Sequence, residues 1–193
     1  SVSAGSITVG TASTDTDITE IDQAIDVTLA ANQTSINEES GTTSVTYTVN
    51  LDAQPNAGNS VSVVLSTGGT ATDGTDFTQN LDAAIAAALP VTGVTYVSGT
   101  NTLTFDNTFV LGSFTFDLTA QNDDIVENPA ETFALTAGSA TITEGTVTVD
   151  GGTSDTETVT INDIDQAIDV TLAANQTSIN EESGTTSVTY TVN

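Results

Sequence analysis

Apolar and polar residues alternate along most of the chain. In residues 45–51, Val, Tyr, Val and Leu fall on one face of an extended backbone, and Thr, Thr and Asn fall on the other. This is the pattern of a half-buried strand. Similar runs recur between turn residues such as Gly, Asn and Asp. The pattern predicts strands at residues 25–29, 45–51, 61–65, 102–105, 114–118, 132–135, 140–149 and 156–161.

About seven or eight strands, rich in β-branched residues, predict an all-β fold of the immunoglobulin-like β-sandwich type. One segment departs from the alternation. Residues 80–89, NLDAAIAAAL, are rich in alanine and stop before Pro90, which predicts a short helix inserted between strands. We expect this helix to cover one edge of the sandwich, because exposed sheet edges need protection.

The sequence also repeats itself. The segment IDQAIDVTLAANQTSINEESGTTSVTYTVN occupies residues 21–50 and again, without a substitution, residues 164–193. The offset of 143 residues (164 − 21) indicates one domain per repeat rather than a solenoid. We expect residues 1–22 to end a preceding repeat, residues 23–165 to form a complete repeat, and residues 166–193 to begin the following one.

Two interpretations of the partial repeats stay open. The chain is either a window of a longer array, which we favour, or an independent subunit. In the second case the unpaired strands of residues 167–193 would be exchanged between neighbouring chains and build a filament.

The charge of the chain excludes several function classes. It has 26 acidic side chains and no Lys, Arg, His or Cys, for a formal net charge of −26. Nucleic-acid binding and attachment to anionic membranes are excluded, because no side chain can neutralise phosphate. Thiolate chemistry, cysteine zinc sites and histidine bases are also absent. No apolar run approaches the ~20 residues of a membrane span, so we expect no membrane insertion in this segment.

High net charge can also indicate disorder. Here, however, 37% of the residues are hydrophobic, and they are arranged in alternating runs rather than scattered. A chain with that pattern can bury an apolar core, so we expect it to fold.

Many carboxylates are grouped in the predicted loops instead of being spread over solvated faces. Like charges at short range repel each other, and the chain has no cationic side chain to offset the repulsion. A divalent cation can hold such a group together, and a ligand set made only of oxygen favours calcium over magnesium. The grouped acids are Glu38, Glu39, Asp73, Asp76, Asp123, Asp124, Glu127, Glu131, Asp163 and Asp165.

Isolated acids have a simpler explanation. We expect them to face water or to cap turns, without a role in metal binding. These residues are Asp52, Asp117, Asp150 and Glu157. Asx hydrogen bonding in turns is a sufficient explanation for Asp106 and also accounts for Asp73.

Four segments resemble the Calx-beta domain family, in the order of the family and across nearly the whole repeat. They are INEESG at 36–41, TGGTATDGTDF at 67–77, LTFDNTFVLGSFTFDLTAQNDDIVENPAETFAL at 103–135 and TVTINDID at 158–165. The second and third are the specific ones, through the DGTDF turn and the later DDxxE and ETF motifs. The resemblance implies a sandwich that holds calcium at one tip, next to the junction with the following domain.

The resemblance also assigns calcium ligands position by position. The glutamate of the ExxG turn falls on Glu38, and the aspartate of the GxDF turn falls on Asp76. Ile164 stands where some members carry a third terminal aspartate, so the resemblance implies two or three ions. The implied ligands are Glu38, Asp76, Asp123, Asp124, Glu127, Glu131, Asp163 and Asp165.

A metal site at Asp163 and Asp165 would lie directly before the first strand of the next copy, so calcium would stiffen that junction. We therefore expect a calcium-stabilised structural repeat of a giant bacterial cell-surface protein, an adhesin stalk or surface filament. Its setting would be extracellular, and its partners would be neighbouring repeats of the same protein, with self-assembly into filaments as a further possibility.

Two other function classes compete with this interpretation. An extracellular module that recognises a glycan or a protein would use exposed aromatic residues, yet the 3 Tyr and 6 Phe mostly occupy core-facing strand positions. An enzyme is the weakest hypothesis. Glu127 and Glu131 could serve glycoside hydrolysis only in a substrate cleft with a raised pKa on one carboxyl, and calcium would lower that pKa instead.

Overall fold

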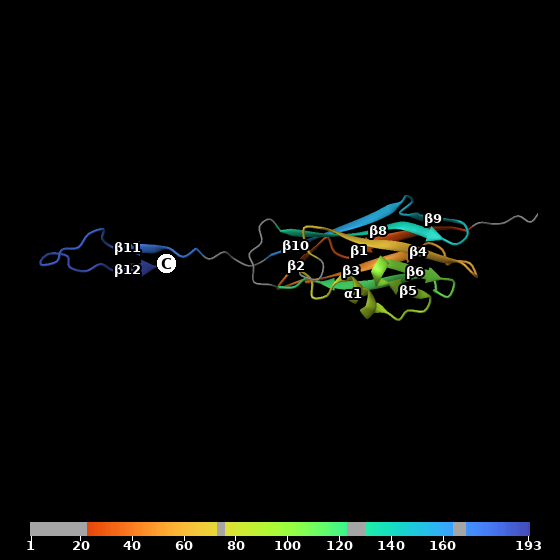
Figure 1. Cartoon of the computed structure of the whole chain (residues 1–193), viewed down its shortest axis with the longest axis horizontal. Coiled ribbons are helices and arrows are strands. Elements are labelled where there is room, and N and C mark those ends of the chain that lie inside the picture. Colours follow the sequence, from red (N-terminus) through yellow and green to blue (C-terminus); the bar gives the residue numbers. More distant parts are fainter. Residues whose placement is uncertain (1–22, 73–75, 123–129, 164–168) are drawn as a thin grey trace, which may run out of the picture.

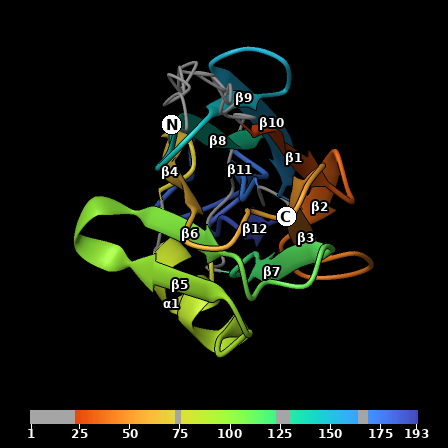
Figure 2. The same cartoon turned by 90° about the vertical axis from the view of Figure 1, so that its right-hand side faces the viewer.

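The sandwich consists of two β-sheets packed face to face (Figures 1 and 2). A computed structural model describes residues 23–72, 76–122, 130–163 and 169–193. One sheet has the strand order β7-β3-β1-β9, and the other has the order β2-β10-β8-β4-β6-β5. The predicted all-β, immunoglobulin-like fold is confirmed. The strands are β1 (Ala24–Ala31), β2 (Ser35–Asn37), β3 (Ser44–Leu51), β4 (Ser60–Gly69), β5 (Val94–Val97), β6 (Thr102–Asp106), β7 (Ser113–Thr119), β8 (Glu131–Ile142), β9 (Thr146–Val149) and β10 (Ser154–Asn162).

The core consists of the alternate residues that the apolar pattern marks. β3 buries every second side chain, and the residues between them stay partly exposed. Aromatic rings fill the space between the sheets: Phe77 meets Phe133 edge to face at 4.8 Å, and Tyr47 stacks on Phe116 at 5.8 Å between ring centroids. Burial of each large apolar side chain contributes about 1.5–3 kcal/mol, so the inner faces of the strands supply most of the stabilisation.

The prediction of separate strands at 132–135 and 140–149 was wrong. β8 is one continuous strand of 12 residues. Its register against β4 shifts between Ser62 and Val64, and Ser139 has a φ of 50°, so a bulge lies where the sequence suggested a turn. The chain does turn at Gly145, which has a φ of 111°, and β9 then joins the other sheet. The short strands β2 and β5 were not predicted.

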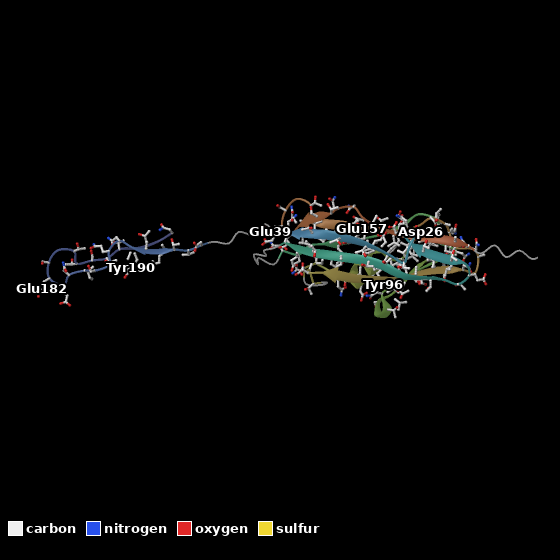
Figure 3. The ribbon with its side chains drawn as sticks, turned by 90° about the horizontal axis from the view of Figure 1, so that it is seen from above. Asp26, Glu39, Tyr96, Glu157, Glu182 and Tyr190 are labelled. Carbon is white, nitrogen blue, oxygen red and sulfur yellow. The ribbon has the colours of Figure 1, made fainter. Side chains whose placement is uncertain are left out.

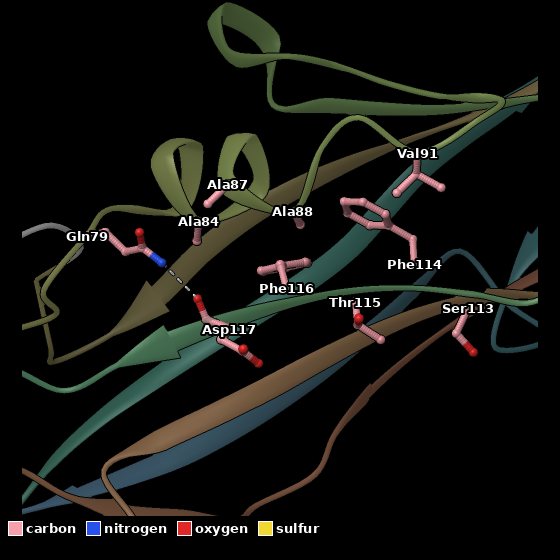
Figure 4. A pocket seen from close by; sticks show the side chains of 10 residues that line it. All are labelled: Gln79, Ala84, Ala87, Ala88, Val91, Ser113, Phe114, Thr115, Phe116 and Asp117. Carbon is pink, nitrogen blue, oxygen red and sulfur yellow. Dashed lines mark hydrogen bonds between the residues drawn. The ribbon is translucent and has the colours of Figure 1, made fainter.

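The predicted helix at 80–89 is present as α1 (Leu81–Ala88). It begins after Asn80, whose Oδ1 atom accepts a hydrogen bond of 2.9 Å from the Ala83 amide. The helix packs against β7, the outer strand of its sheet, as expected for a cover over an edge (Figure 4). The described residues include no helix with the length and apolar character needed to cross a bilayer.

The first strand passes from one sheet to the other. β1 pairs with β3 and β9, and after a bend at Asn32 the chain continues as β2, which pairs with β10. The Asn32 Oδ1 atom accepts a hydrogen bond of 2.7 Å from the Thr46 amide, which fixes the bend against β3. The chain therefore enters the sandwich at Gln23 and leaves it after Asn162 at the opposite end.

The second copy of the repeated segment forms a separate hairpin of β11 (Leu172–Ala174) and β12 (Tyr190–Val192). Both strands are exposed along their whole length. Residues 1–22 lie outside the described residues, and the division at residues 22 and 165 stays a prediction.

Candidate metal centre

β2 and β10 are parallel neighbours that end at the same edge of their sheet. Their last residues, Asn37 and Asn162, are paired, and the Asn162 Nδ2 group donates to Asn37 Oδ1 at 3.2 Å. The Glu38 amide donates to the Asn162 carbonyl, also at 3.2 Å. Glu38 and Asp163 therefore follow neighbouring strands at one point, although they are far apart in the sequence.

Glu131 reaches the same end of the sandwich from a third strand. It opens β8, which runs antiparallel to β10, and it pairs with Ile161 near the end of β10. Antiparallel pairing places the start of one strand beside the end of its neighbour. The strand register thus brings together the backbone positions of three predicted ligands, Glu38, Glu131 and Asp163.

Asp76 belongs to a turn that is bound to the start of β8. The amides of Thr70 and Ala71 both donate to the Thr132 carbonyl, at 2.8 and 2.9 Å. The Asp76 Oδ2 atom accepts a hydrogen bond of 2.5 Å from the Thr72 amide. Asp76 is therefore the fourth predicted ligand at this end, and one of its carboxylate oxygens holds the turn.

Glu38 has an unusual environment for a carboxylate. Only 7% of its surface is exposed, and no other acid among the described residues is buried to this degree. Burial of an ionised carboxylate costs several kcal/mol unless hydrogen bonds or an opposite charge compensate. The chain contains no Lys, Arg or His, so no side chain can supply that positive charge. This position suits a bound cation, and carboxylate and carbonyl oxygens are the ligands that calcium prefers.

The segment with three further predicted ligands starts close by. Asn122 Nδ2 donates to Glu39 Oε1 at 2.7 Å, and Glu39 marks this end of the sandwich in Figure 3. Asn122 immediately precedes residue 123 in the sequence. The predicted ligands that lie outside the described residues are Asp123, Asp124, Glu127 and Asp165.

The carboxylates themselves do not enclose a common point within the described part of the chain. Among residues 23–72, 76–122, 130–163 and 169–193, no three acidic side chains lie close enough together to hold a metal ion. The structure does bring the backbone positions of four predicted ligands to one end of the sandwich: Glu38, Glu131 and Asp163 at the ends of strands, and Asp76 in a turn.

The isolated acids Asp52, Asp106 and Asp150 lie at or next to turns, as expected. Asp52 Oδ1 accepts a hydrogen bond of 2.7 Å from the backbone of β1. Asp106 Oδ1 accepts from the hydroxyl and the amide of Thr108, at 2.6 and 2.7 Å, and these two bonds lower the pKa of Asp106. Asp150 lies in a turn with a φ of 48°. Asp73 is not among the described residues.

Glu157 is only partly exposed, so the expectation that it merely faces water or caps a turn holds in part. It shares one face of β10 with the buried Val159 and Ile161. Burial raises the pKa of Glu157, and the carboxylates of Asp155 and Asp150 raise it further. The position of Glu157 in the strand directs its side chain toward the inner face, whereas its charge had suggested a side chain directed toward solvent.

Asp155 has a structural role that the sequence reading missed. Its Oδ2 atom accepts a hydrogen bond of 2.8 Å from the Leu29 amide, which fastens β10 to β1 of the other sheet. Burial, and then the charge of Glu157, raises the pKa of Tyr47 well above its ordinary value. The signal for these inward acids was available, because residues 155, 157, 159 and 161 share one face of a strand.

A groove of about 390 Å³ lies between α1 and β7 (Figure 4). Asp117 is the single acid in its lining, and Gln79 Nε2 donates to the Asp117 carbonyl at 3.3 Å. The Asp117 carboxylate accepts from the Thr46 hydroxyl at 2.6 Å. The lining of this groove therefore lacks the paired carboxylates that glycoside hydrolysis requires.

Comparison with known proteins gives one family match. The sequence model of the Calx-beta domain matches residues 20–83 and 87–165, well over half of the chain. Among solved structures, the chain is similar to the apo form of the Calx CBD1 domain, with 20% identity and a TM-score of 0.43, over 72% of this chain and 98% of that one. It is also similar to the sixth cohesin of scaffoldin B from Acetivibrio cellulolyticus, solved with a Cel5 dockerin, with 13% identity and a TM-score of 0.33, over 72% and 99%. No characterised protein matches by sequence.

Proposed function

The chain belongs to the Calx-beta domain family, a calcium-binding type of module, and from this premise we propose that it binds calcium at the end of the sandwich where β10 stops. The burial of Glu38 in a chain without cationic side chains carries the proposal. Calcium would supply the missing positive charge. The residues that would hold it are Glu38, Asp76, Glu131 and Asp163, completed by Asp123, Asp124, Glu127 and Asp165.

We propose further that this site stiffens the junction between repeats of a large extracellular protein, such as a bacterial adhesin stalk or surface filament. The chain enters at the end marked by Asp26 and leaves at the end marked by Glu39 (Figure 3). By identity with Ala24, the first strand of the next copy would begin at Ala167, so four residues, 163–166, would separate it from Asn162. A linker this short places the junction beside the site.

The extracellular setting is supported by family and composition. Calx-beta domains are typically extracellular. Millimolar calcium is available outside cells to saturate sites of the affinity that extracellular modules have. The absence of Lys and Arg leaves trypsin-like proteases no bond to cut, and a net charge of −26 keeps long arrays dispersed.

Thermal unfolding of the full chain with calcium and with a chelator tests the binding. At calcium concentrations about 100-fold above the dissociation constant, binding adds about 2.7 kcal/mol, which raises the Tm by roughly 10 °C for a domain of this size. Magnesium should substitute poorly. A Tm that is the same with calcium and with chelator would refute the proposal.

A matched pair of variants locates the site. Glu38→Gln should lose most of the calcium-dependent rise, and in chelator it should melt at or above the wild-type Tm, because a buried charge has been removed. Glu181→Gln changes the same residue in the second copy, where it is exposed, and should keep the full calcium response. Equal responses of the two variants would place the ion elsewhere.

The stiffening needs its own measurement. In X-ray scattering, a polypeptide of two complete repeats should have a longer and narrower distance distribution with calcium than with chelator. An unchanged profile would refute the stiffening and leave the binding itself intact.

A further inference from the structure

The outer edge of β7 is used by the chain itself over only part of its length. The Thr78 amide donates to the Thr119 carbonyl at 2.9 Å, and Gln79 Nε2 donates to the Asp117 carbonyl at 3.3 Å. This short segment therefore lies beside the end of β7 in the position of an additional strand. At Asn80 the chain turns into α1 and leaves the edge.

The beginning of β7 has backbone groups that face the same edge. Residues along an antiparallel strand direct their backbone groups alternately toward one side and the other. Since the carbonyls of Asp117 and Thr119 face away from β3, the amides and carbonyls of Ser113 and Thr115 do so too. In the described part of the chain, no hydrogen bond involves these outward groups of Ser113 and Thr115. A strand edge with free amides and carbonyls is a template for pairing with another chain.

The groove between α1 and β7 follows this unpaired edge. Its lining extends from Ser113 to Asp117, a distance of about 13 Å at about 3.3 Å per residue, which suits an extended segment of about five residues. The rings of Phe114 and Phe116 lie between the strand and the helix, whereas the Thr115 side chain points away from α1 (Figure 4). The helix contributes only small side chains to the lining, those of Ala84, Ala87 and Ala88. Larger residues at these positions would fill the space, so the groove depends on the alanine content of α1.

Exposed apolar side chains continue the groove beyond its Ser113 end. Val91 lines the groove and is 36% exposed. Val110 and Leu111, which lie shortly before Ser113 in the sequence, are 79% and 52% exposed. Single exposed apolar residues are common on protein surfaces, but several of them beside an unpaired strand edge mark an interaction surface.

The charge of the chain determines which partner fits. Asp117 lies in the lining at the other end of the groove, and its side chain is exposed. Opposite charges directly across a strand pair are favourable, and like charges are unfavourable. A second copy of the chain carries a net charge of −26 without Lys or Arg, so it is a poor partner. We propose that the groove binds an extended segment of another protein, in which apolar residues alternate with Lys or Arg, and that this segment pairs with β7 as an added strand.

This interaction is separate from calcium binding. The described lining of the groove contains none of the implied calcium ligands. Peptide binding and the calcium response of the chain can therefore fail independently of each other.

Two alanines of α1 provide a matched pair of variants. Ala87 lines the groove and Ala86 does not, and both are exposed. Leucine is nearly as good a helix former as alanine, so Ala87→Leu and Ala86→Leu should both fold like the wild type. The probe is a phage-displayed library of random seven-residue peptides, selected on the full chain. Enriched peptides should alternate apolar residues with Lys or Arg, and their affinity should fall on the order of tenfold for A87L and stay unchanged for A86L.

The two variants have the same charge, so non-specific attraction of cationic peptides to an acidic chain acts on both equally. Hydrogen exchange gives a second readout in the unmodified chain. In the free chain the outward Thr115 amide should exchange faster than the Phe116 amide, which faces β3. An enriched peptide should slow exchange at the Thr115 amide on the order of tenfold and leave the Phe116 amide unchanged.

Several results would overturn the proposal. They are a selection without enriched peptides, equal affinity of the peptides for A86L and A87L, and an unchanged exchange rate at the Thr115 amide. Enriched peptides that carry Asp or Glu in place of Lys or Arg would contradict the charge of the partner. Slower exchange at the Thr115 amide at high protein concentration, without any peptide, would show that a second copy occupies the edge instead.

Discussion

Residues 21–50 and 164–193 have one sequence and two environments. Their turns are alike: the Asn37 amide donates to the Thr42 carbonyl at 2.8 Å, and the Asn180 amide donates to the Thr185 carbonyl at the same distance. Gly41 and the equivalent Gly184 both adopt a left-handed conformation, with φ of 78° and 82°. These features arise in both places, so the local sequence is sufficient to determine them.

The strands of the two copies differ in length. β1 and β3 have eight residues each, whereas β11 and β12 have three. Residues 24–26 of β1 pair with β9, and residues 44–46 of β3 pair with β7. Hairpin register is therefore a local property, while strand length and burial depend on the neighbouring strands. An isolated two-stranded sheet is marginal in water for the same reason.

The largest expected effect comes from truncating a core side chain of the first copy, with the equivalent substitution in the second copy as its control. Leu29→Ala leaves a cavity in the packed core and should lower the free energy of unfolding by about 2–5 kcal/mol. Leu172→Ala changes an exposed side chain and should stay within about 0.5 kcal/mol of the wild type. Urea denaturation of dilute protein measures both. A comparable loss in the second copy would contradict the difference in environment.

A smaller effect should come from the hydrogen bond at the bend. Asn32→Ala removes the acceptor for the Thr46 amide and should cost about 1 kcal/mol of the free energy of unfolding. Asn175→Ala removes the same bond from the second copy. It should leave the unfolding midpoint of the sandwich unchanged and speed hydrogen exchange at the Thr189 amide. Equal shifts in midpoint for the two variants would mean that the hairpin and the sandwich unfold together.

The smallest expected effect on stability concerns Glu157 of β10. Its charge acts on Tyr47, a core residue of the first copy. The pKa of Glu157 is raised in the fold, mainly by burial, so the protonated carboxyl is favoured. The protonated Glu157 contributes stability at pH values below the ordinary glutamate pKa of 4.5. That contribution is lost as the pH rises through the higher pKa that Glu157 has in the folded chain. Glu157→Gln should raise the Tm at pH 7 by no more than about 2 °C, because the side chain is only partly buried.

The pH dependence is the control for that prediction. Well below pH 4.5 the variant and the wild type should melt together, because Glu157 is then protonated in both the folded and the unfolded chain. A difference in Tm that persists at low pH would indicate a packing effect of the amide instead of the charge.

Long, half-buried strands such as β3 could be predicted from alternation alone, and so could α1 from its alanine content and following proline. The errors occur where a strand depends on its neighbours. β2 has three residues and exists because β10 lies beside it. The Gly138-Ser139 sequence resembles a turn, yet β4 pairs with β8 on both sides of it, so the strand continues through a bulge.

The candidate site was predictable to a similar degree. The grouping of acids in loops was visible in the sequence, and resemblance to a family named the individual ligands. That Glu38, Glu131 and Asp163 lie at one end follows from the registers of β2, β8 and β10, which no local pattern determines. The inward positions of Asp155 and Glu157 were missed because charge was given more weight than strand periodicity.

The parallel pairing of β2 with β10 has a mechanical consequence. A pulling force that enters at Gln23 and leaves at Asp163 loads β2 from its first residue and β10 from its last. Since the two strands run in the same direction, the force acts in shear, and their hydrogen bonds must break together instead of unzipping one after another. Single-molecule stretching between these residues should therefore show one high, abrupt rupture. Stretching between Val94 and Phe105, which are paired at one end of the antiparallel strands β5 and β6, should unzip those strands at a lower force.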